Sequence, residues 1–546
     1  MLKKEYGRGI RAWSKQWSWI GLGIGALCLV VLPSIFQPSI AATSLTSMDE
    51  TGVDAIRVHS EPYNLQGRKV AIGQVEIGRP GIFGFDKVMG WNPPFNVAQT
   101  FLKDEPARAN QAVDTHAFMV AGVMISQDKG IPGVAPLAQL YSGAVGSPRS
   151  NGQPEMCLAS QHVARQNGGD VRSINFSFGE PLARDPRPNA ALDGNALLTQ
   201  CIDWSARVHD VLYTIAGNQG GGGIAIPTDN FNGVNVAYSA RRQGIYNKID
   251  FSNLSAAPVG VGRTIVQREI NVGPRRSISI AAPGHNVNVF NLEGRIERVT
   301  GTSFAAPHVN ATVAVLQELG DRQTSQKATN WSVDSRQPEV MKAVILNAAD
   351  KVKDAGDGNL LGMSRTVLAK DEKNWLESDA YSDPQIPLDF QMGTGHLNVY
   401  RAVQQFQPGQ QAAATAAQPI GWDYGTVTTG GFQDYPLDRP LTQGSFASVT
   451  LAWHRLVDLQ DKNNNEAYDV GETFSDRGLN NLDLYLLPVD ATNNSQSVCA
   501  SLSPADSLEH IFCPVPTTGK YKIRVQYRDQ VNEPQQAYGL AWWTKS

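Results

Sequence analysis

Short apolar runs alternate with amphipathic stretches between about Gly67 and Phe406, and this alternation restricts the possible fold more than any other feature of the chain. The apolar runs expected to form strands are residues 69–75, 140–145, 171–178 and 211–215. The stretches expected to form helices are residues 116–126, 197–208, 303–319 and 338–349. Strands and helices in alternation are typical of a mainly parallel sheet with helices on both faces. We therefore expect an α/β domain over 67–406, with its site at the carboxyl ends of the strands.

The rest of the chain has a different pattern. Its 546 residues are too many for one typical domain. Residues 407–420 have no apolar periodicity and predict a linker. Four later segments alternate apolar with polar residues or are rich in β-forming residues, namely residues 448–453, 482–487, 521–527 and 537–543. This pattern predicts a small all-β domain over 421–546, a sandwich or a barrel, of which we favour the sandwich.

The first 42 residues resemble neither part. A basic start precedes an uncharged apolar run over 19–36, and small residues follow up to Ala42. This order is that of a secretory signal peptide, which would leave 43–66 as a short N-terminal segment. The alternative is a membrane anchor that is never cut, because the run is near the ~18 residues at which spanning becomes possible. In either case we expect a secreted or periplasmic protein, with membrane contact only through this segment if it stays uncut.

Cysteine usage agrees with export. Of five cysteines, Cys28 lies in the apolar run, which leaves Cys157, Cys201, Cys499 and Cys513 in the body of the chain. An even number in an exported protein permits disulfides, although three pairings are possible and four free thiols are the alternative. The first two lie on predicted helices, and the last two are close enough in sequence to join a hairpin. No Cys-x-x-Cys string indicates a zinc or redox motif.

Composition and charge exclude some partners. The chain is 41% hydrophobic and 18% charged, as expected of a globular protein. Its net charge of -4 offers no large basic field, so we expect no nucleic-acid partner. No His-Glu-x-x-His string is present, which argues against metalloprotease chemistry.

The octapeptide Gly301-Thr-Ser-Phe-Ala-Ala-Pro-His308 contains the strongest candidate nucleophile. Ser303 stands where a helix is expected to begin, so its hydroxyl would lie at the positive end of the helix dipole. Its small neighbours leave room for a substrate backbone. From this local pattern alone, an ordinary helix-capping serine is an equal alternative.

The octapeptide resembles the nucleophile motif of the subtilisin-like serine peptidases, the subtilases. Two other motifs of that family follow its chain order: His116-Ala-Phe-Met-Val-Ala-Gly122 is similar to the base motif, and Ile215-Ala-Gly-Asn218 to the oxyanion motif. Residues 117–119 differ from the usual family residues. The resemblance covers about residues 66–406, and further similar segments are residues 133–141, 174–179, 280–284 and 393–398.

The acid of the family motif is where this chain departs from the pattern. The family has Asp after the first strand, whereas here the best match is Glu76, which is one methylene longer. Loss of the acid would lower turnover by roughly 10⁴. Asp114 and Asp86 are weaker stand-ins. If Glu76 is an ordinary strand-end residue, the chain is an inactive scaffold that binds peptides or assembles through its β domain.

The resemblance implies a serine endopeptidase that works through an acyl-enzyme. In that mechanism Glu76 orients His116, and His116 takes the proton of Ser303. Asn218 and the backbone N–H of Ser303 would hold the oxyanion. Catalysis of this kind needs no metal or organic cofactor.

The resemblance also implies where a polypeptide substrate would bind. An extended substrate would pair with the main chain of Ser177, Phe178 and Gly179, with Gly217 leaving space for its backbone. An esterase of the α/β-hydrolase class is a weak alternative, because its Gly-x-Ser-x-Gly motif requires glycine where this chain has Ala305.

One acidic stretch of the β domain fits part of a calcium-loop template. Loop positions one, three, five, nine and twelve are occupied by Asp461, Asn463, Asn465, Asp469 and Glu472. The sixth position, where glycine is usual, is Glu466. The stretch predicts either a structural calcium site or a solvated acidic turn.

Overall fold

The computed structural model describes residues 47–147, 151–217, 226–242, 244–249 and 275–546. All of them belong to one compact unit. The predicted signal peptide at 1–42 lies outside the described residues. Within the described part of the chain, no helix combines the length and the apolar character needed to cross a membrane.

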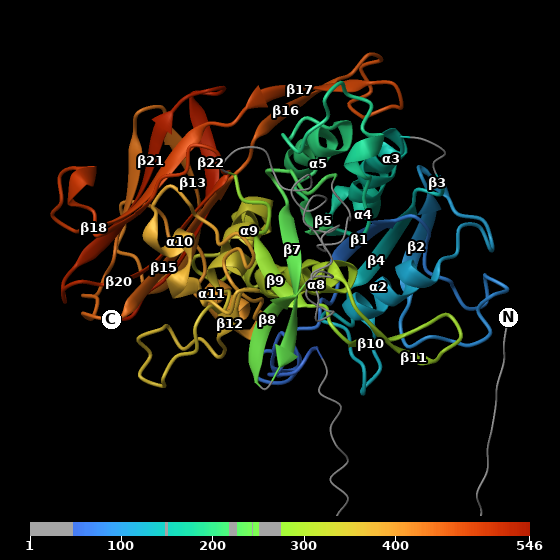
Figure 1. Ribbon diagram of the computed structural model, residues 1–546, viewed down its shortest axis with the longest axis horizontal. Helices are drawn as coiled ribbons and strands as arrows, with labels where there is room; N and C mark the ends of the chain where they lie inside the picture. The colour runs from blue at the N-terminus through green and yellow to red at the C-terminus, as the bar shows by residue number, and fades with distance from the viewer. Residues whose placement is uncertain (1–46, 148–150, 218–225, 243, 250–274) are drawn as a thin grey trace, which may run out of the picture. The chain divides into compact units, whose positions relative to one another are not determined.

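Among the described residues, a mainly parallel sheet of ten strands forms the centre of the first part, as predicted (Figure 1). Strands β2, β4, β1, β5, β6 and β7 lie side by side and run parallel, and β9 pairs in parallel with β7. The antiparallel pairs are those of β3 with β2 and of β8 with β7. The ten strands are β1 Ala71–Glu76, β2 Val97–Leu102, β3 Glu105–Pro106, β4 Gln139–Ala144, β5 Val171–Phe176, β6 Leu212–Ala216, β7 Val234–Arg242, β8 Ile245–Ile249, β9 Ile280–Pro283 and β12 Val367–Leu368.

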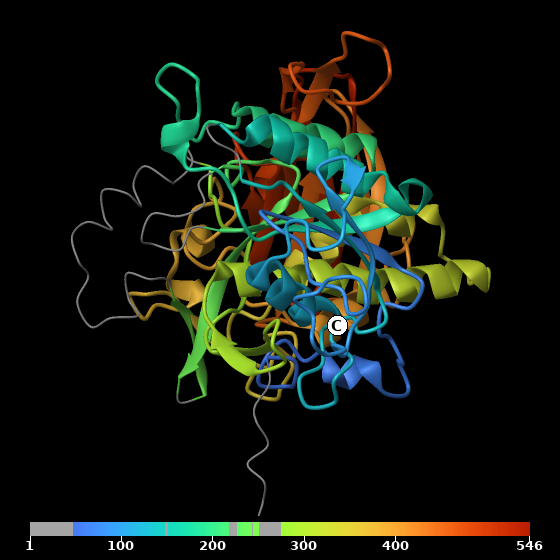
Figure 2. The ribbon, with the colours of Figure 1, turned by 90° about the vertical axis from the view of Figure 1, so that its right-hand side faces the viewer.

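Helices cover both faces of this sheet, because the strands are apolar on both sides. Ala71 and Val75 of β1 face one core, which includes residues of α3 and α5, whereas Ile72 faces the other, which includes residues of α2 and α8. In Figures 1 and 2, α3 and α5 lie together on one side of the strands. The helices are α1 Ile56–His59, α2 Thr115–Ile125, α3 Gln153–Ala164, α4 Gln166–Gly169, α5 Leu197–Val208, α8 Thr302–Ser325, α9 Pro338–Asn347, α10 Asp379–Ser382 and α11 Val399–Phe406.

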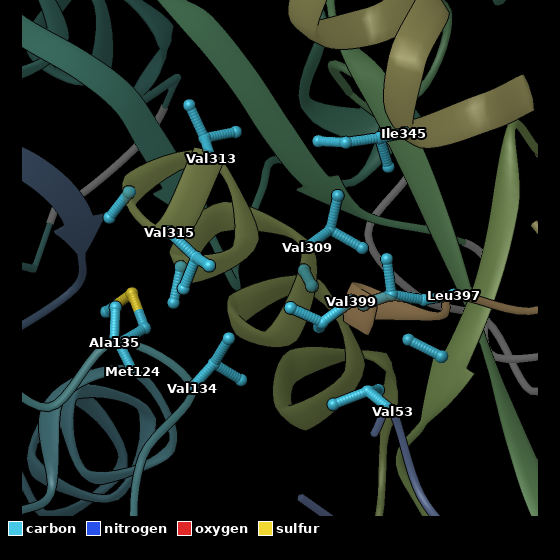
Figure 3. Close-up of a cluster of buried hydrophobic side chains, with 14 of the residues drawn as sticks. Val53, Met124, Val134, Ala135, Val309, Val313, Val315, Ile345, Leu397 and Val399 are labelled. Carbon is cyan, nitrogen blue, oxygen red and sulfur yellow. The ribbon is translucent and has the colours of Figure 1, made fainter. Parts of the chain in front are cut away.

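Helix α8 is the central helix of the larger core. Its residues from Thr302 to Gly320 are all buried. Figure 3 shows Val309 on the side of Leu397 and Val399, and Val315 on the side of Val134. The helix continues to Ser325, six residues beyond the predicted end. The prediction stopped early because the last turn is polar and does not extend the apolar pattern.

Two antiparallel four-stranded sheets make up the C-terminal part of the chain, residues 420–543, which is called the β domain below. One has the order β13-β22-β15-β20 and the other β14-β21-β18-β19. Apolar side chains of both sheets share one core, as in the predicted sandwich. The strands are β13 Ile420–Thr428, β14 Phe432–Pro436, β15 Phe446–Trp453, β18 Asn481–Pro488, β19 Cys499–Ser501, β20 Leu508–Pro514, β21 Tyr521–Asp529 and β22 Gln535–Trp543; the hairpins β10 Val287–Phe290 with β11 Ile296–Val299 and β16 Leu456–Gln460 with β17 Thr473–Gly478 lie outside the larger sheets.

Helix α9 packs directly against the β domain. A Cβ atom at Gly539 of β22 would lie 2.3 Å from the carbonyl group of Glu339, so only glycine permits this approach. Gln405 of α11 donates to the carbonyls of Gly421 and Trp542 at 2.9 and 2.8 Å. The predicted linker lies between α11 and β13, and its role as a domain boundary stays a prediction.

The four cysteines of the body form two disulfides. Cys157 of α3 is joined to Cys201 of α5, so this bond ties together the two helices of one face. Cys499 of β19 is joined to Cys513 of β20. These strands belong to different sheets, so the second bond connects the two sheets and does not close the hairpin that sequence proximity suggested.

Candidate active site

The candidate residues meet at the carboxyl edge of three adjacent strands. Strand β1 ends at Glu76, its neighbour β5 is followed by Ser177, and β6, which pairs with β5, is followed by Gly217. Parallel neighbours end at the same edge of a sheet, which is where sites of α/β proteins form. Helix α8 begins beside this edge, after Gly301, whose φ of 153° is one that side chains rarely permit.

Glu76 is a buried carboxylate beside the imidazole of His116. Its side chain is 2% exposed, and its Oε2 lies 3.3 Å from Nδ1 of His116. Its Oε1 has no hydrogen-bond partner among the described residues. Burial raises the pKa of Glu76, and His116 opposes that rise. The contact therefore stabilises the charged carboxylate and the charged imidazolium together.

His116 is the second residue of α2, and Asp114 determines where that helix begins. The Asp114 carboxylate accepts the backbone N–H of Ala117 at 2.8 Å, the usual N-cap bond. The His116 side chain is 38% exposed. Partial burial favours the neutral ring, but the Glu76 carboxylate and, to a smaller degree, Asp114 outweigh it, so the pKa of His116 is raised above 6.5.

Ser303 lies in the first turn of α8, next to a residue that touches His116. The ring of Phe304 is 5.5 Å from the His116 ring, at an interplanar angle of 57°. The Ser303 hydroxyl donates to the carbonyl of Ser177 at 3.1 Å. Within the described part of the chain no hydrogen bond joins Ser303 to His116. Hydrogen bonds of catalytic groups are often long or unformed before substrate binds.

The two other carboxylates considered from the sequence have different partners. Asp86 accepts two hydrogen bonds of 2.6 Å from the guanidinium of Arg79, and both side chains are fully buried. Asp114 caps α2, as described above. Glu76 is therefore the carboxylate that the fold brings to the Nδ1 atom of His116.

The predicted oxyanion donor, Asn218, lies outside the described residues, so its role stays a prediction. Gly217 before it is described. Its N–H donates to the carbonyl of Val236 at 2.9 Å. A Cβ at this position would lie 3.0 Å from the carbonyl oxygen of Val236 and 2.9 Å from the end of the Ile278 side chain, so a larger residue here would crowd its neighbours.

The predicted substrate-binding segment, residues 177–179, offers a bound peptide its main chain more than its side chains. Phe178 is 6% exposed, and its ring stacks on that of Phe176 with 5.1 Å between centroids. Ser177 is buried and Gly179 half-buried. A peptide at this edge would therefore meet backbone atoms of 177–179, while the Phe178 ring belongs to the core.

Two neighbours of the site were not predicted from the sequence. Phe304, which directly follows Ser303, is the ring that packs on His116. Ser177 was expected only to bind substrate, whereas its hydroxyl donates to the carbonyl of Ser303 at 2.8 Å. The alternation of polar residues along 173–177 was the available indication.

The five residues of the calcium template come together in the loop between β16 and β17. The Asp469 carboxylate accepts the side-chain amides of Asn463 and Asn465 at 2.7 and 2.8 Å. Asp461 accepts three backbone N–H groups of its own loop, and Glu472 accepts two. No group of three or more His, Cys, Asp or Glu side chains among the described residues is placed to hold a metal ion. Calcium binding stays a prediction.

Comparison with known proteins identifies the family. The model of the Subtilase family matches residues 92–364, half of the chain, a span that includes His116 and Ser303 and begins after Glu76. Subtilisin Savinase of Lederbergia lenta is 26% identical over 285 residues, which are 51% of this chain and 84% of Savinase. The alkaline protease of Shouchella clausii is also 26% identical over 285 residues, but these are 60% of its length.

Among solved structures, the MycP3 protease from the type VII (ESX-3) secretion system aligns with 67% of this chain and 90% of its own. Its sequence identity is 16% and its TM-score 0.40. The family match, together with the parallel sheet and the order of the motifs along the chain, leads to one conclusion. The chain belongs to the subtilase family of serine peptidases.

Proposed function

We propose that the chain is an active serine endopeptidase with Glu76 as the acid, His116 as the general base and Ser303 as the nucleophile. The observation that carries the proposal is the position of the imidazole. Its Nδ1 lies 3.3 Å from the buried Glu76 carboxylate, and its ring packs on Phe304, which directly follows Ser303. A carboxylate, an imidazole and a hydroxyl in this order are the parts of a nucleophilic triad.

The proposed reaction proceeds through an acyl-enzyme. Glu76 holds the Nδ1–H of His116, so that Nε2 is free to take the proton of the Ser303 hydroxyl. The Ser303 oxygen attacks the peptide carbonyl, and the backbone N–H of Ser303 and the side chain of Asn218 hold the oxyanion. His116 then gives the proton to the leaving amine, and water hydrolyses the ester by the reverse proton path. Before the attack, the Ser303 hydroxyl must give up its hydrogen bond to the Ser177 carbonyl and donate to Nε2 of His116 instead.

The substrate would be an extended polypeptide bound through its main chain. Residues 177–179 follow β5 at the edge of the site, and the Phe178 side chain faces the core. Main-chain pairing recognises an extended strand with little regard to its side chains. Gly217, which has no side chain, would leave space for the residue at the cleaved bond.

The competing function is a scaffold without activity. Glu in the place of the family's Asp and the hydrogen bond of Ser303 to the Ser177 carbonyl are the observations that favour it. Treatment with a fluorophosphonate, followed by mapping of the labelled peptide and by casein digestion, separates the two functions. We expect a label on Ser303 and cleavage of casein, with neither in a His116→Ala variant. If Ser303 stays unlabelled under conditions that fully label Savinase, the enzyme proposal is wrong.

The pH dependence of kcat/KM should report the pKa of His116, which its neighbours shift. The base must be neutral, so activity should rise with pH through the pKa of His116. Because Glu76 and Asp114 raise that pKa, the midpoint of the acid limb should lie above 6.5. A pH series with a short peptide ester, in buffers of constant ionic strength, measures this midpoint. A midpoint below 6.5 would contradict the assigned pairing of Glu76 with His116.

We also propose that residues 1–42 export the chain to the periplasm or the medium. The two disulfides of the body support this, because such bonds form and persist in oxidising compartments. N-terminal sequencing of the protein recovered from outside the cytoplasm tests it. A first residue near Thr43 is expected for a cut signal peptide, and an intact N-terminus in the membrane fraction indicates an anchor.

We propose separately that the loop of residues 461–472 binds a structural calcium ion, which takes no part in catalysis. Carboxylate and amide oxygens are the ligands that calcium takes, and Glu466 adopts the positive φ of 59° that glycine usually supplies at the sixth position. If the loop binds calcium, 1 mM CaCl₂ should raise the melting temperature above that in EGTA by a few degrees, as about 1 kcal/mol of stabilisation would. The Asp461→Ala variant should show no such difference. Equal melting temperatures of the unsubstituted chain in both buffers would show that the loop is an acidic turn.

A further inference from the structure

One face of the strand beside the site is polar although it is buried. Ser173 and Asn175 of β5 and Ser177 directly after it alternate with Ile174 and Phe176. The apolar pair belongs to the core that α3 and α5 cover. The three polar residues face the other way, toward α8, and all three are buried. Buried polar groups are costly unless they are hydrogen-bonded, so this polar row needs partners on α8.

Two members of the polar row donate to main-chain carbonyls of α8. The Ser173 hydroxyl donates to the carbonyl of Asn310 at 3.0 Å. The Ser177 hydroxyl donates to the carbonyl of Ser303 at 2.8 Å. Because hydrogen bonds are directional, these two contacts restrict how far α8 can slide along the sheet. Asn310 is about two turns beyond Ser303, so only the second contact lies at the nucleophile.

The carbonyl of Ser303 needs an outside donor because of the helix sequence. In a regular α-helix the N–H of residue 307 would donate to the carbonyl of residue 303. Residue 307 is a proline inside α8, and proline has no N–H. The Ser177 hydroxyl therefore replaces the missing helical donor at the turn that carries the candidate nucleophile.

A third residue directs the proton of Ser177. The side-chain amide of Asn175 donates to the Ser177 hydroxyl oxygen at 2.8 Å. With its oxygen engaged as an acceptor, the Ser177 hydroxyl points its hydrogen at the carbonyl of Ser303. The Ser303 hydroxyl in turn donates to the carbonyl of Ser177 at 3.1 Å. The two serines are therefore joined by two hydrogen bonds, in each of which the hydroxyl of one donates to the main-chain carbonyl of the other.

We propose that Ser177, oriented by Asn175, is a positioning residue that holds the first turn of α8 so that the Ser303 hydroxyl and N–H are placed for reaction. This inference rests on the proposed function. The backbone N–H of Ser303 has no partner within the helix, since it belongs to the first turn, and is available to an oxyanion. A shift of the peptide groups in this turn would move both the nucleophile and this donor. Misplacement by about 1 Å costs on the order of 10²-fold in rate.

The test compares Ser177→Ala with Ser173→Ala in the full chain. Both substitutions remove one hydroxyl from the same face and one hydrogen bond to α8, and Ser177→Ala also removes the acceptor of the Asn175 amide. A merely structural role would lower the melting temperature and leave kcat of the folded enzyme unchanged. We expect Ser177→Ala to lower kcat at least tenfold, with KM changed less than twofold, and to slow phosphonylation of Ser303 equally. We expect Ser173→Ala to keep both rates within twofold of the unsubstituted chain. Both melting temperatures should fall, that of Ser177→Ala further because it also leaves the Asn175 amide without its acceptor, so kcat is measured well below both.

Several outcomes would overturn the inference. It is wrong if Ser177→Ala keeps kcat within twofold, or if Ser173→Ala loses as much as Ser177→Ala. If Ser177→Ala does not fold, Ser177→Cys, which keeps a weaker donor, should show a smaller loss in the same direction. If the unsubstituted chain itself does not react, the proposed function fails. Crystal structures then decide the positioning role, because the carbonyl of Ser303 should be displaced in Ser177→Ala and unmoved in Ser173→Ala.

Discussion

Replacing Ser303 with alanine should lower kcat by about 10⁶-fold, the loss typical for the nucleophile of such a triad. Without the hydroxyl no acyl-enzyme can form, and the residual rate comes from the oxyanion donors and substrate binding alone. The fold should tolerate the change. The substitution removes one hydrogen bond, from the Ser303 hydroxyl to the Ser177 carbonyl, which contributes about 1 kcal/mol. Turnover of a peptide anilide and a thermal melt of the same preparation measure both quantities.

A matched control for this substitution is Ser325→Ala, at the exposed end of the same helix. It removes the same group from α8 far from the site and should keep kcat within twofold. A Ser303→Ala preparation that retains more than a hundredth of the activity, with contaminating protease excluded by an inhibitor, would mean that the nucleophile is another residue.

Glu76→Gln should lower kcat by about 10⁴-fold, nearly as much as loss of the acid in related triads. Glutamine has the same size, so the buried site should keep its packing. Its neutral amide cannot stabilise the imidazolium that forms in the transition state, and its NH₂ group can turn toward Nδ1 and favour the wrong tautomer. Steady-state kinetics on the folded variant measure the loss.

The same variant also tests what raises the pKa of His116. The Glu76 carboxylate is the main group that raises the pKa of this histidine against burial. In Glu76→Gln the pKa of His116 should fall, so the acid limb of kcat/KM should move to lower pH. The Glu76→Asp variant keeps the charge at a greater distance and should retain more activity than Glu76→Gln.

Glu293→Gln, on the exposed turn between β10 and β11, is the matched control for charge removal. It should change neither kcat nor the pH profile. If Glu76→Gln keeps kcat within tenfold of the unsubstituted chain, Glu76 is not the acid, and the buried carboxylate serves only the fold.

Elements with a strong local pattern were predicted well. The helix expected at residues 197–208 is α5, Leu197–Val208, because its apolar residues recur at helical spacing. The strand expected at 69–75 is β1, Ala71–Glu76, within two residues at each end. The end of α8 was missed because residues 321–325 are polar, and a helix can continue over a polar turn once its buried part is formed.

Contacts between different elements of the fold were harder to predict from the sequence. Cys499 and Cys513 are close in sequence, yet they lie on strands of different sheets, because neighbouring strands of a sandwich can cross from one sheet to the other. For the candidate site, the motif order identified Ser303 and His116. It favoured Glu76 over Asp114 and Asp86, but which carboxylate lies at the imidazole depends on which side chain the fold directs there.

By itself, the sequence determined the α/β class, the family motifs and the residue types at each candidate position, because these depend on local periodicity and on side-chain chemistry. The tertiary structure alone decided that Glu76 approaches His116, that Asp86 is occupied by Arg79, and that Ser177 supplies the donor missing at Pro307. Each of these is a distance between residues far apart in the chain. Such distances follow from how strands register and how α8 packs on the sheet, and no local pattern specifies them.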